Sequence, residues 1–350
     1  QGSYLTDGKA GMSSGKSVTE RLFSFFARAN YSYQDKYMLS ASIRHEGSSK
    51  FAADNRWANF WSATAGWRIS NEEFMKDFDW LDDLKIRFGY GVTGNNDFSA
   101  TYMANMLGSD TNWMMPNGTW AYSYGKSQNV NPNLGWEEKK EWNLGVDYSF
   151  FEGRLYGKFD YYRREVDNLL FSVKVPQPPY TQGSQMQNIG SMESKGWEFE
   201  VGGDIIRTKD FTWSSSMNLS HNTGKILTLE GDNSYHNGNG FVAPGTQGDA
   251  ARMEAGSTIG SFYMWKFAGF DDEGSFLLYN KDGEVIPAAQ KTENDKQYIG
   301  NYTPKLIIGW SHTLTYKNFD LGINLRSWID FDVYNTINMY YGIQGQGNLN

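Results

Sequence analysis

Hydrophobic and polar residues alternate along long stretches of this chain. Between residues 23 and 33 every odd position holds Phe, Ala or Tyr, whereas the even positions include Ser24, Arg28 and Asn30. Successive side chains of a β-strand point to opposite faces, so the stretch predicts a strand with one apolar and one polar face. Similar runs cover residues 23–33, 37–46, 57–69, 84–93, 141–150, 155–162, 197–205, 211–219, 305–316 and 319–326.

The length of the runs and the position of their aromatic residues favour a membrane barrel. Strands of soluble proteins average about 5–6 residues, whereas a tilted membrane strand needs about 9–11. Phe23 and Tyr33 bracket Ala27 and Ala29, as expected for the aromatic girdles of an outer-membrane barrel. The pattern predicts an all-β protein, a transmembrane antiparallel β-barrel. The alternative is a soluble all-β protein with one buried face per strand.

The connections between runs are of two kinds. Outer-membrane barrels have short periplasmic turns and long external loops. We therefore place 70–83 on the periplasmic side, with a helical turn at 80–84, and expect a further barrel hairpin from 262–270 and 275–279. This gives about 12 strands. The short connections are 34–36, 151–153, 207–210 and 317–318, and the long ones are 95–139, 165–194 and 223–257.

The polar faces carry many charges of both signs, which favours a wide lumen filled by water or by a plug. Because about 12 strands would not close such a barrel, we expect the chain to be part of a larger one. The charged residues predicted to face the lumen are Arg28, Arg44, Glu46, Lys85, Arg87, Glu141, Asp147, Lys158, Asp160, Glu198, Glu200, Asp204 and Arg326.

Composition excludes several other classes. There is no cysteine, which rules out disulfide scaffolds and thiolate metal sites. The net charge of −8 disfavours a nucleic-acid partner. Aromatic residues make up 16% of the chain, so it has the apolar surface needed to fold. Mean hydropathy is −0.62, which fits a barrel that averages a lipid-facing side with a polar lumen.

Catalytic, cofactor and metal motifs are weak. Residues 89–94 match the pattern GxGxxG, but no helical period follows to hold a pyrophosphate, so a strand is favoured. Glu137 and Glu138 follow Trp136, but adjacent strand residues point to opposite faces and form no catalytic pair. We predict no catalytic residue, cofactor or metal site. The histidines without metal-ligand spacing are His45, His221, His236 and His312.

The long loops are rich in aromatic and amide side chains. Aromatic faces with amide donors suit stacking on sugars, and they suit protein contacts equally well. The residues predicted to bind substrate are Trp113, Trp120, Tyr122, Tyr124 and Tyr180.

Several segments, in order along the chain, resemble the SusC/RagA family. The strongest signature is Gly89-Tyr90-Gly91-Val92-Thr93-Gly94-Asn95-Asn96, of which Gly89, Gly91, Gly94 and Asn95 are the family-motif residues. The other matching segments are Phe60-Trp61-Ser62, Gly66-Trp67-Arg68-Ile69-Ser70, Glu73-Phe74-Met75, Leu84-Lys85-Ile86-Arg87, Asn131-Pro132-Asn133-Leu134-Gly135-Trp136-Glu137, Asn188-Ile189-Gly190, Lys195-Gly196-Trp197-Glu198, Phe211-Thr212-Trp213 and Tyr316-Lys317-Asn318-Phe319-Asp320-Leu321.

This resemblance implies part of a TonB-dependent transporter barrel of about 22 strands in the outer membrane. It implies that the plug, the TonB box, an N-terminal domain and the final strands lie outside residues 1–350. It further implies a SusD-like surface lipoprotein, TonB and outer-membrane lipids as partners, and import of a glycan or a peptide rather than enzyme activity. The alternatives are a passive porin-like channel and a secreted all-β protein that binds or processes glycans.

Overall fold

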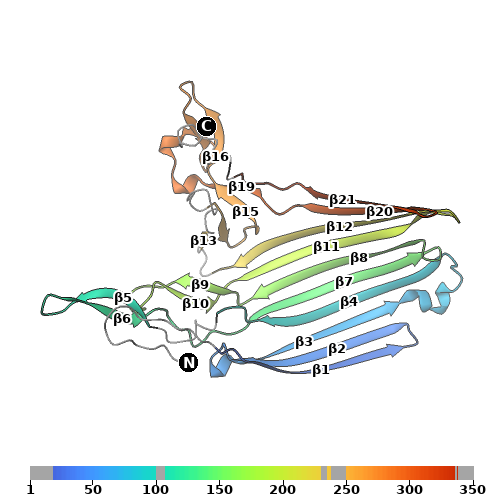
Figure 1. Cartoon of the computed structure of the whole chain (residues 1–350), viewed down its shortest axis with the longest axis horizontal. Coiled ribbons are helices and arrows are strands. Elements are labelled where there is room, and N and C mark those ends of the chain that lie inside the picture. Colours follow the sequence, from blue (N-terminus) through green and yellow to red (C-terminus); the bar gives the residue numbers. More distant parts are fainter. Residues whose placement is uncertain (1–18, 100–106, 230–234, 238–249, 336, 338–350) are drawn as a thin grey trace.

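The computed structural model describes residues 19–99, 107–229, 235–237, 250–335 and 337. One large antiparallel sheet dominates these residues, with the order β1-β2-β3-β4-β7-β8-β11-β12-β20-β21 (Figure 1). Its strands are 11 to 18 residues long. They are β1 (Leu22–Tyr33), β2 (Tyr37–Ser48), β3 (Trp57–Arg68), β4 (Leu81–Asn95), β7 (Glu137–Phe150), β8 (Leu155–Asp167), β11 (Ser191–Arg207), β12 (Phe211–Thr228), β20 (Leu306–Tyr316) and β21 (Phe319–Ile329).

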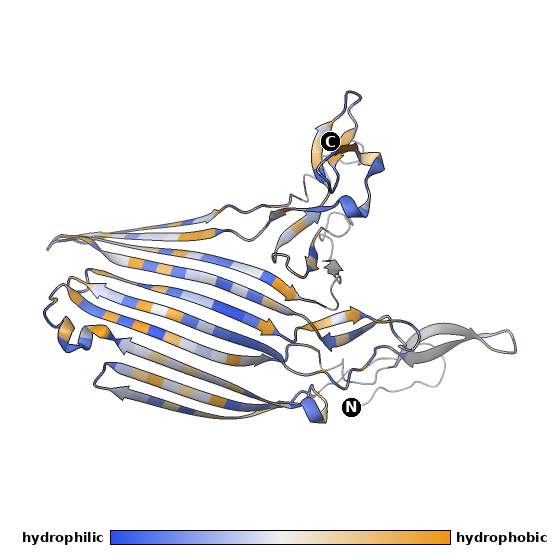
Figure 2. Cartoon of the chain, turned by 180° about the vertical axis from the view of Figure 1, so that it is seen from behind, coloured by the Kyte–Doolittle hydropathy of each residue, from blue (hydrophilic) through white to orange (hydrophobic). Residues whose placement is uncertain are grey.

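The two faces of this sheet follow the predicted alternation. Figure 2 shows hydrophilic and hydrophobic residues alternating along the long strands. Large apolar side chains on one face are open to the surroundings, for example Phe25 at 61% and Leu39 at 54% exposure. A soluble protein would cover such a face, whereas lipid covers it in a barrel. The sheet therefore has the all-β, two-faced form of a membrane barrel wall.

The large sheet contains ten strands among the described residues, two fewer than predicted. The expected hairpin does form, from β16 (Lys266–Phe270) and β17 (Phe276–Tyr279), but it pairs with β18 (Val285–Pro287) in a separate sheet. β12 pairs directly with β20 instead. The prediction was based on the alternation of short turns and long loops along the chain. That alternation is kept whether the segment adds two strands to the large sheet or none, so it could not decide between them.

The remaining strands form small sheets outside the large one. They are β5 (Leu107–Met114) with β6 (Trp120–Lys126), β9 (Leu170–Lys174) with β10 (Ser184–Asn188), β13 (Tyr235–Asn237) with β14 (Arg252–Glu254), and β15 (Ser261–Met264) with β19 (Gln297–Asn301). All of them lie in the long connections, at what we call the long-loop end of the sheet (Figure 1). The opposite, short-turn end carries the connections 34–36, 69–80, 151–154, 208–210 and 317–318.

The connection 69–80 is the longest at the short-turn end. It holds two 3₁₀ turns, η2 (Ile69–Asn71) and η3 (Glu73–Met75), whereas residues 81–84 already belong to β4. The helical turn predicted at 80–84 is therefore wrong, because backbone pairing with β7 extends to Leu81. The other 3₁₀ turns are η1 (Ala53–Asn55), η5 (Ala288–Gln290) and η6 (Glu293–Asp295). Among the residues described, no helix has the length and apolar character needed to cross a membrane.

Glu72 fastens this connection to the sheet. Its carboxylate accepts hydrogen bonds from the Tyr37 hydroxyl at 2.6 Å, the Lys36 ammonium at 3.0 Å and the Trp67 ring N–H at 3.1 Å. These donors, the Tyr37 hydroxyl foremost, lower the pKa of Glu72 to about 2. Hydrogen bonds to the ionised form favour ionisation.

Candidate functional site

The candidate site is the polar face of the large sheet, because it is the wall that faces the lumen of a barrel. Cross-strand register places Gly91 of β4 opposite Ser62 of β3 and Glu141 of β7. Glu141 in turn lies opposite Arg164 of β8. The register therefore gathers on one face the polar residues of successive strands, as the sequence predicted.

One part of this wall is a cluster of cross-strand ion pairs centred on Arg87. The Arg87 guanidinium donates two hydrogen bonds of 2.8 Å to the carboxylate of Asp147 and one of 3.1 Å to Asp160. A bidentate arginine–carboxylate pair is among the stronger charge-assisted contacts. One side chain thus ties together β4, β7 and β8.

Further ion pairs extend this cluster along β7, β8 and β11. Glu141 accepts from Arg164 at 2.8 Å and from Lys139 at 3.1 Å. Lys158 lies 3.2 Å from Glu200. We call the set the ion-pair block. Its members are Arg87, Lys139, Glu141, Asp147, Lys158, Asp160, Arg164 and Glu200.

A glycine makes the Arg87 contacts possible. Gly145 lies directly opposite Arg87 on β4 and Asp160 on β8. A Cβ on Gly145 would lie 2.6 Å from an Arg87 guanidinium nitrogen and 2.7 Å from an Asp160 oxygen. The absence of a side chain at Gly145 therefore leaves the space through which Arg87 reaches both carboxylates.

The neighbouring part of the wall holds a group of uncharged polar side chains. The Ser40 hydroxyl donates to Asn30 at 2.8 Å, and the hydroxyls of Ser42 and Ser62 share a hydrogen bond of 2.7 Å. Thr64 lies opposite Ser40. We call these five residues the hydroxyl patch. A hollow of about 520 Å³ is lined by Asn30, Ser40 and Thr64, among other residues.

The family-motif glycines lie beside this patch on β4. Gly89 lies opposite Thr64 and Gly91 opposite Ser62. A Cβ would lie 3.3 Å from Thr64 Cγ2 at Gly89 and 3.0 Å from Ser62 Cβ at Gly91. Residues 89–94 are strand, as predicted. Because Gly89 and Gly91 have no side chains, nothing from β4 covers Ser62 and Thr64 at these positions.

Gly94 and Asn95, the other two motif residues, act at the long-loop end of the sheet. The ring of Phe60 packs where a side chain of Gly94 would lie. Phe60 belongs to the main buried cluster of Phe51, Phe60, Phe98, Leu134 and Trp136. The Asn95 amide donates to Glu137 at 2.9 Å and its carbonyl accepts the Asp97 N–H at 3.0 Å. These two residues thus have a structural role, in holding the external loops on the barrel.

Four of the five predicted substrate-binding aromatics share one external hairpin. Trp113 is on β5, and Trp120, Tyr122 and Tyr124 are on β6. The Trp120 side chain is 66% exposed. Tyr180 lies elsewhere, in the connection between β9 and β10, where it is half-buried and its N–H bonds to the Pro176 carbonyl at 3.3 Å. The backbone therefore places four of the predicted residues on one hairpin and leaves the fifth apart. The side chains of Trp113, Tyr122 and Tyr124 lie outside the described set.

Asparagines missed by the sequence analysis hold two external loops together. Asn129 donates to the carbonyls of Gln182 at 2.6 Å and Ser184 at 2.9 Å. Asn188 accepts from the Gly135 N–H at 2.7 Å and donates to the Gly135 carbonyl at 2.9 Å. For Asn188 the available signal was the matching segment 188–190, whereas Asn129 lies outside the matching segments.

The small sheet β16-β17-β18 presents an apolar face at the long-loop end. Phe270 and Phe276 lie opposite each other and are each 59% exposed, and Phe267 is 51% exposed. Their ring centroids are 5.0 to 6.0 Å apart. The acidic residues Asp272 and Glu273 form the adjoining turn. We call Phe267, Phe270 and Phe276 the phenylalanine face.

Histidines were predicted to have no metal role, and His312 was placed at the membrane interface. His312 lies on the apolar face, where the Trp213 ring N–H donates to its Nδ1 at 3.3 Å, and the Trp310 ring centroid is 4.6 Å away. Across the described ranges, no group of three or more His, Asp or Glu side chains is placed to hold a metal ion. His236 belongs to β13, whereas its side chain lies outside the described set.

Comparison with known proteins gives a consistent result. Residues 2–335 match the family described as TonB dependent receptor-like, beta-barrel. The TonB-dependent receptor SusC of Bacteroides thetaiotaomicron is 34% identical over 89% of this chain and 32% of its own length. The TonB-dependent receptor P3 of Formosa agariphila is 33% identical over 90% of this chain and 32% of its own length.

Solved structures agree with the sequence matches. The RagAB peptide transporter superimposes with a TM-score of 0.73 at 28% identity, covering 88% of this chain and 33% of that chain. The RagAB peptide importer in its open-open state gives a TM-score of 0.76 at 27% identity, over 89% of this chain and 33% of that one. The chain therefore spans about a third of the length of the relatives it matches.

Proposed function

The chain belongs to the TonB-dependent receptor β-barrel family, and from that membership we propose that it forms part of an importer that moves a glycan or a peptide across the outer membrane. The observation that carries the proposal is the two-faced sheet of ten long strands, with an apolar outer face and an ion-paired inner one. A wall with so many inward charges suits a wide, occupied lumen. The protein is then a transporter and not an enzyme.

Energy for import would come from TonB, acting through a plug and a TonB box outside residues 1–350. Membership of the TonB-dependent receptor family is the basis for preferring active import to a passive porin-like channel. A secreted all-β protein that processes glycans is disfavoured, because the exposed apolar face suits lipid rather than water.

A SusD-like surface lipoprotein is the proposed partner at the long-loop end. The phenylalanine face supports this proposal, because three exposed aromatic rings on one small sheet form the kind of apolar patch that a protein partner covers. Asp272 and Glu273 beside it favour basic groups at the edge of the partner's surface.

Trp113, Trp120, Tyr122, Tyr124 and Tyr180 remain the proposed substrate contacts. Four of them belong to the β5–β6 hairpin, where the described side chain, Trp120, is exposed to a ligand. Stacking on sugar rings and packing on peptide side chains are both open to such residues.

The test is uptake by cells of the native host that carry the full-length gene or its deletion. Growth on a panel of polysaccharides and peptides identifies the substrate, and removal of TonB or of the lipoprotein abolishes uptake if the proposal holds. Uptake that continues without TonB would support a porin instead. Hydrolysis of a polysaccharide by the pure full-length protein would support the enzyme alternative.

A further inference from the structure

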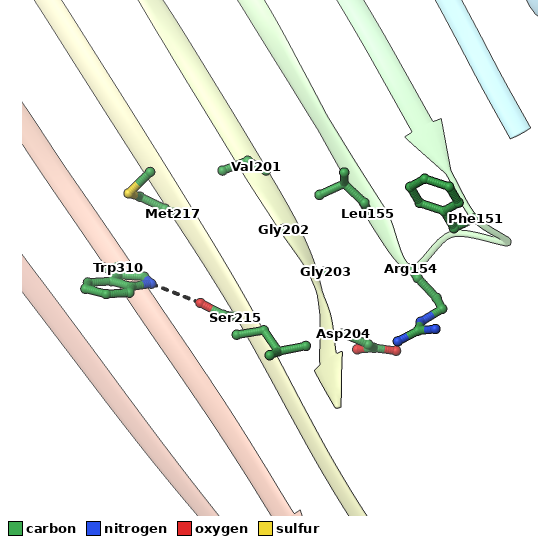
Figure 3. Close-up of a pocket in the computed structure, with 11 residues that line it drawn as sticks. Phe151, Arg154, Leu155, Val201, Gly202, Gly203, Asp204, Ser215, Met217 and Trp310 are labelled. Carbon is green, nitrogen blue, oxygen red and sulfur yellow. Dashed lines mark hydrogen bonds between the residues drawn. The ribbon is translucent and has the colours of Figure 1, made fainter. Parts of the chain in front are cut away.

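A hollow of about 560 Å³ lies on the apolar face of the sheet at its short-turn end (Figure 3). Val201, Met217 and Trp310 lie side by side on β11, β12 and β20 and form one wall. Gly203 and Ser215 lie opposite each other and form the floor, with Leu155 on the far side of Gly203. Because this face is the lipid-facing one, the hollow opens toward the membrane.

The hollow is built into the backbone. A Cβ at Gly203 would overlap the Arg154 carbonyl oxygen, which itself accepts the Asp204 N–H at 3.0 Å. No larger residue can therefore fill the floor without moving the β7–β8 turn. Beside it, the Ser215 hydroxyl accepts the Trp310 ring N–H at 2.9 Å and holds that ring at the rim (Figure 3).

A β-bulge shapes the outer edge of the hollow. The register between β11 and β12 shifts between Asp204 and Ile206, so Ile205 is the extra residue. Ile205 and Ile206 are 50% and 38% exposed. Bulges bend a strand and increase its twist, which widens the space beside it.

The two charged residues at the short-turn end of the hollow differ in their partners. Asp204 is engaged by the Ser214 hydroxyl at 2.6 Å and by the Arg207 guanidinium at 3.3 Å. Arg154 lines the same end (Figure 3), is exposed, and takes part in none of the described ion pairs. A cation at the membrane boundary next to an apolar hollow matches the chemistry of a phospholipid, which joins an anionic phosphate to apolar chains.

We propose that this hollow binds one glycerophospholipid of the inner leaflet, with an acyl chain over Gly203 and Ser215 and the phosphate at Arg154. The inference depends on the membrane position of the sheet and not on import, so it stands if the substrate or the energy source differs. Its two components are separable, because Val201 shapes only the apolar part and Arg154 only the polar end.

Native mass spectrometry of the full-length protein, released from mild detergent, tests the proposal. The wild type is expected to retain one phospholipid. Val201→Phe fills the hollow and should lower the retained fraction at least fivefold, and Arg154→Gln should lower it about threefold. Heat-modifiable migration in gels, as shown by folded barrels, checks that each variant folds.

Matched variants outside the hollow serve as controls. Ala63→Phe adds the same ring at a small lipid-facing position of β3, and Arg207→Gln removes a cation that is already paired with Asp204. Both should retain the lipid as the wild type does. The proposal is overturned if wild type and Val201→Phe lose lipid equally, or if Arg207→Gln matches Arg154→Gln. Retention of lipopolysaccharide in place of phospholipid would also overturn it, because that lipid comes from the other leaflet.

Discussion

The ion-pair block and the hydroxyl patch occupy the same face of the same sheet, yet they are built differently. In the block, every charged member has an oppositely charged partner within 3.2 Å, on its own strand, on a neighbouring strand or, for Asp160, on β4 two strands away. In the patch, short neutral side chains bond to each other.

The difference shows how a barrel wall can carry charge without a large penalty. An unpaired charge away from water is costly, and a cross-strand partner offsets that cost. The neutral residues of the patch need no such partner, and Arg28, opposite Ser42, is exposed and in none of the described ion pairs. We infer that the block gives the wall its rigidity, whereas the patch leaves room for whatever occupies the lumen.

The strongest way to break this comparison is Arg87→Met. The change leaves Asp147 and Asp160 without their shared cation and should lower the free energy of unfolding by about 2 kcal/mol. The matched change beside the patch, Arg28→Met, should cost less than about 0.5 kcal/mol, because Arg28 is in none of the described ion pairs. Denaturant unfolding of the full-length protein in detergent measures both, and equal losses would refute the distinction.

A pair of glycine substitutions tests the same difference between the ion-pair block and the hydroxyl patch. Gly145→Ala places a methyl group within 2.7 Å of both Arg87 and Asp160 and should cost about 1–2 kcal/mol. Gly89→Ala meets only a methyl group of Thr64, at 3.3 Å, so the cost should be below about 0.5 kcal/mol. The same unfolding assay measures the loss of unfolding free energy in both variants. A larger cost at Gly89 would mean that the patch, not the block, is the tightly packed region.

Within the patch itself the expected effect is small. Ser42→Ala removes one neutral hydrogen bond to Ser62, which retains access to water in the lumen. The expected loss is about 0.5 kcal/mol. A loss as large as that of Arg87→Met would show that the patch is as strongly coupled as the block.

The last prediction concerns the pH dependence of the connection 69–80 at the short-turn end, outside the block and the patch, where we expect only a local effect. The pKa of Glu72 is lowered to about 2, so its stabilisation is complete above its unfolded-state pKa of about 4.3 and is lost as the pH falls toward 2. The protection of residues 69–80 against hydrogen exchange, taken relative to the intrinsic exchange rate at each pH, should therefore decrease below about pH 4.5. In Glu72→Gln this protection should already be lower at pH 7 and should not decrease further through that range. An unchanged pH profile in the variant would assign the effect to another carboxylate.

Much of the fold could be predicted from sequence because it depends on local alternation. Phe25 and Leu39 were assigned to the outer face, and Arg87 and Asp147 to the inner one, by parity alone. The motif glycines Gly89 and Gly91 were correctly assigned to a strand.

Other features could not be predicted because they depend on distant residues. Residues 262–280 were assigned to the barrel so that short and long connections would keep alternating, and the direct pairing of β12 with β20 excludes them from the large sheet. The loop-bridging asparagines Asn129 and Asn188 contact residues about 50 positions away. Trp113, Trp120, Tyr122, Tyr124 and Tyr180 stay predictions as substrate contacts.

The sequence by itself determined which side chains face lipid and which face the lumen, because a strand alternates with a fixed period of two. It also determined where the short turns lie. Only the tertiary structure decided which charges meet. Arg87 is 60 residues from Asp147 and 73 from Asp160, and they come together because register places Gly145 between them. Alternation is a property of one strand, whereas register is a property of neighbouring strands, joined here by a long loop between β4 and β7 and by a short turn between β7 and β8.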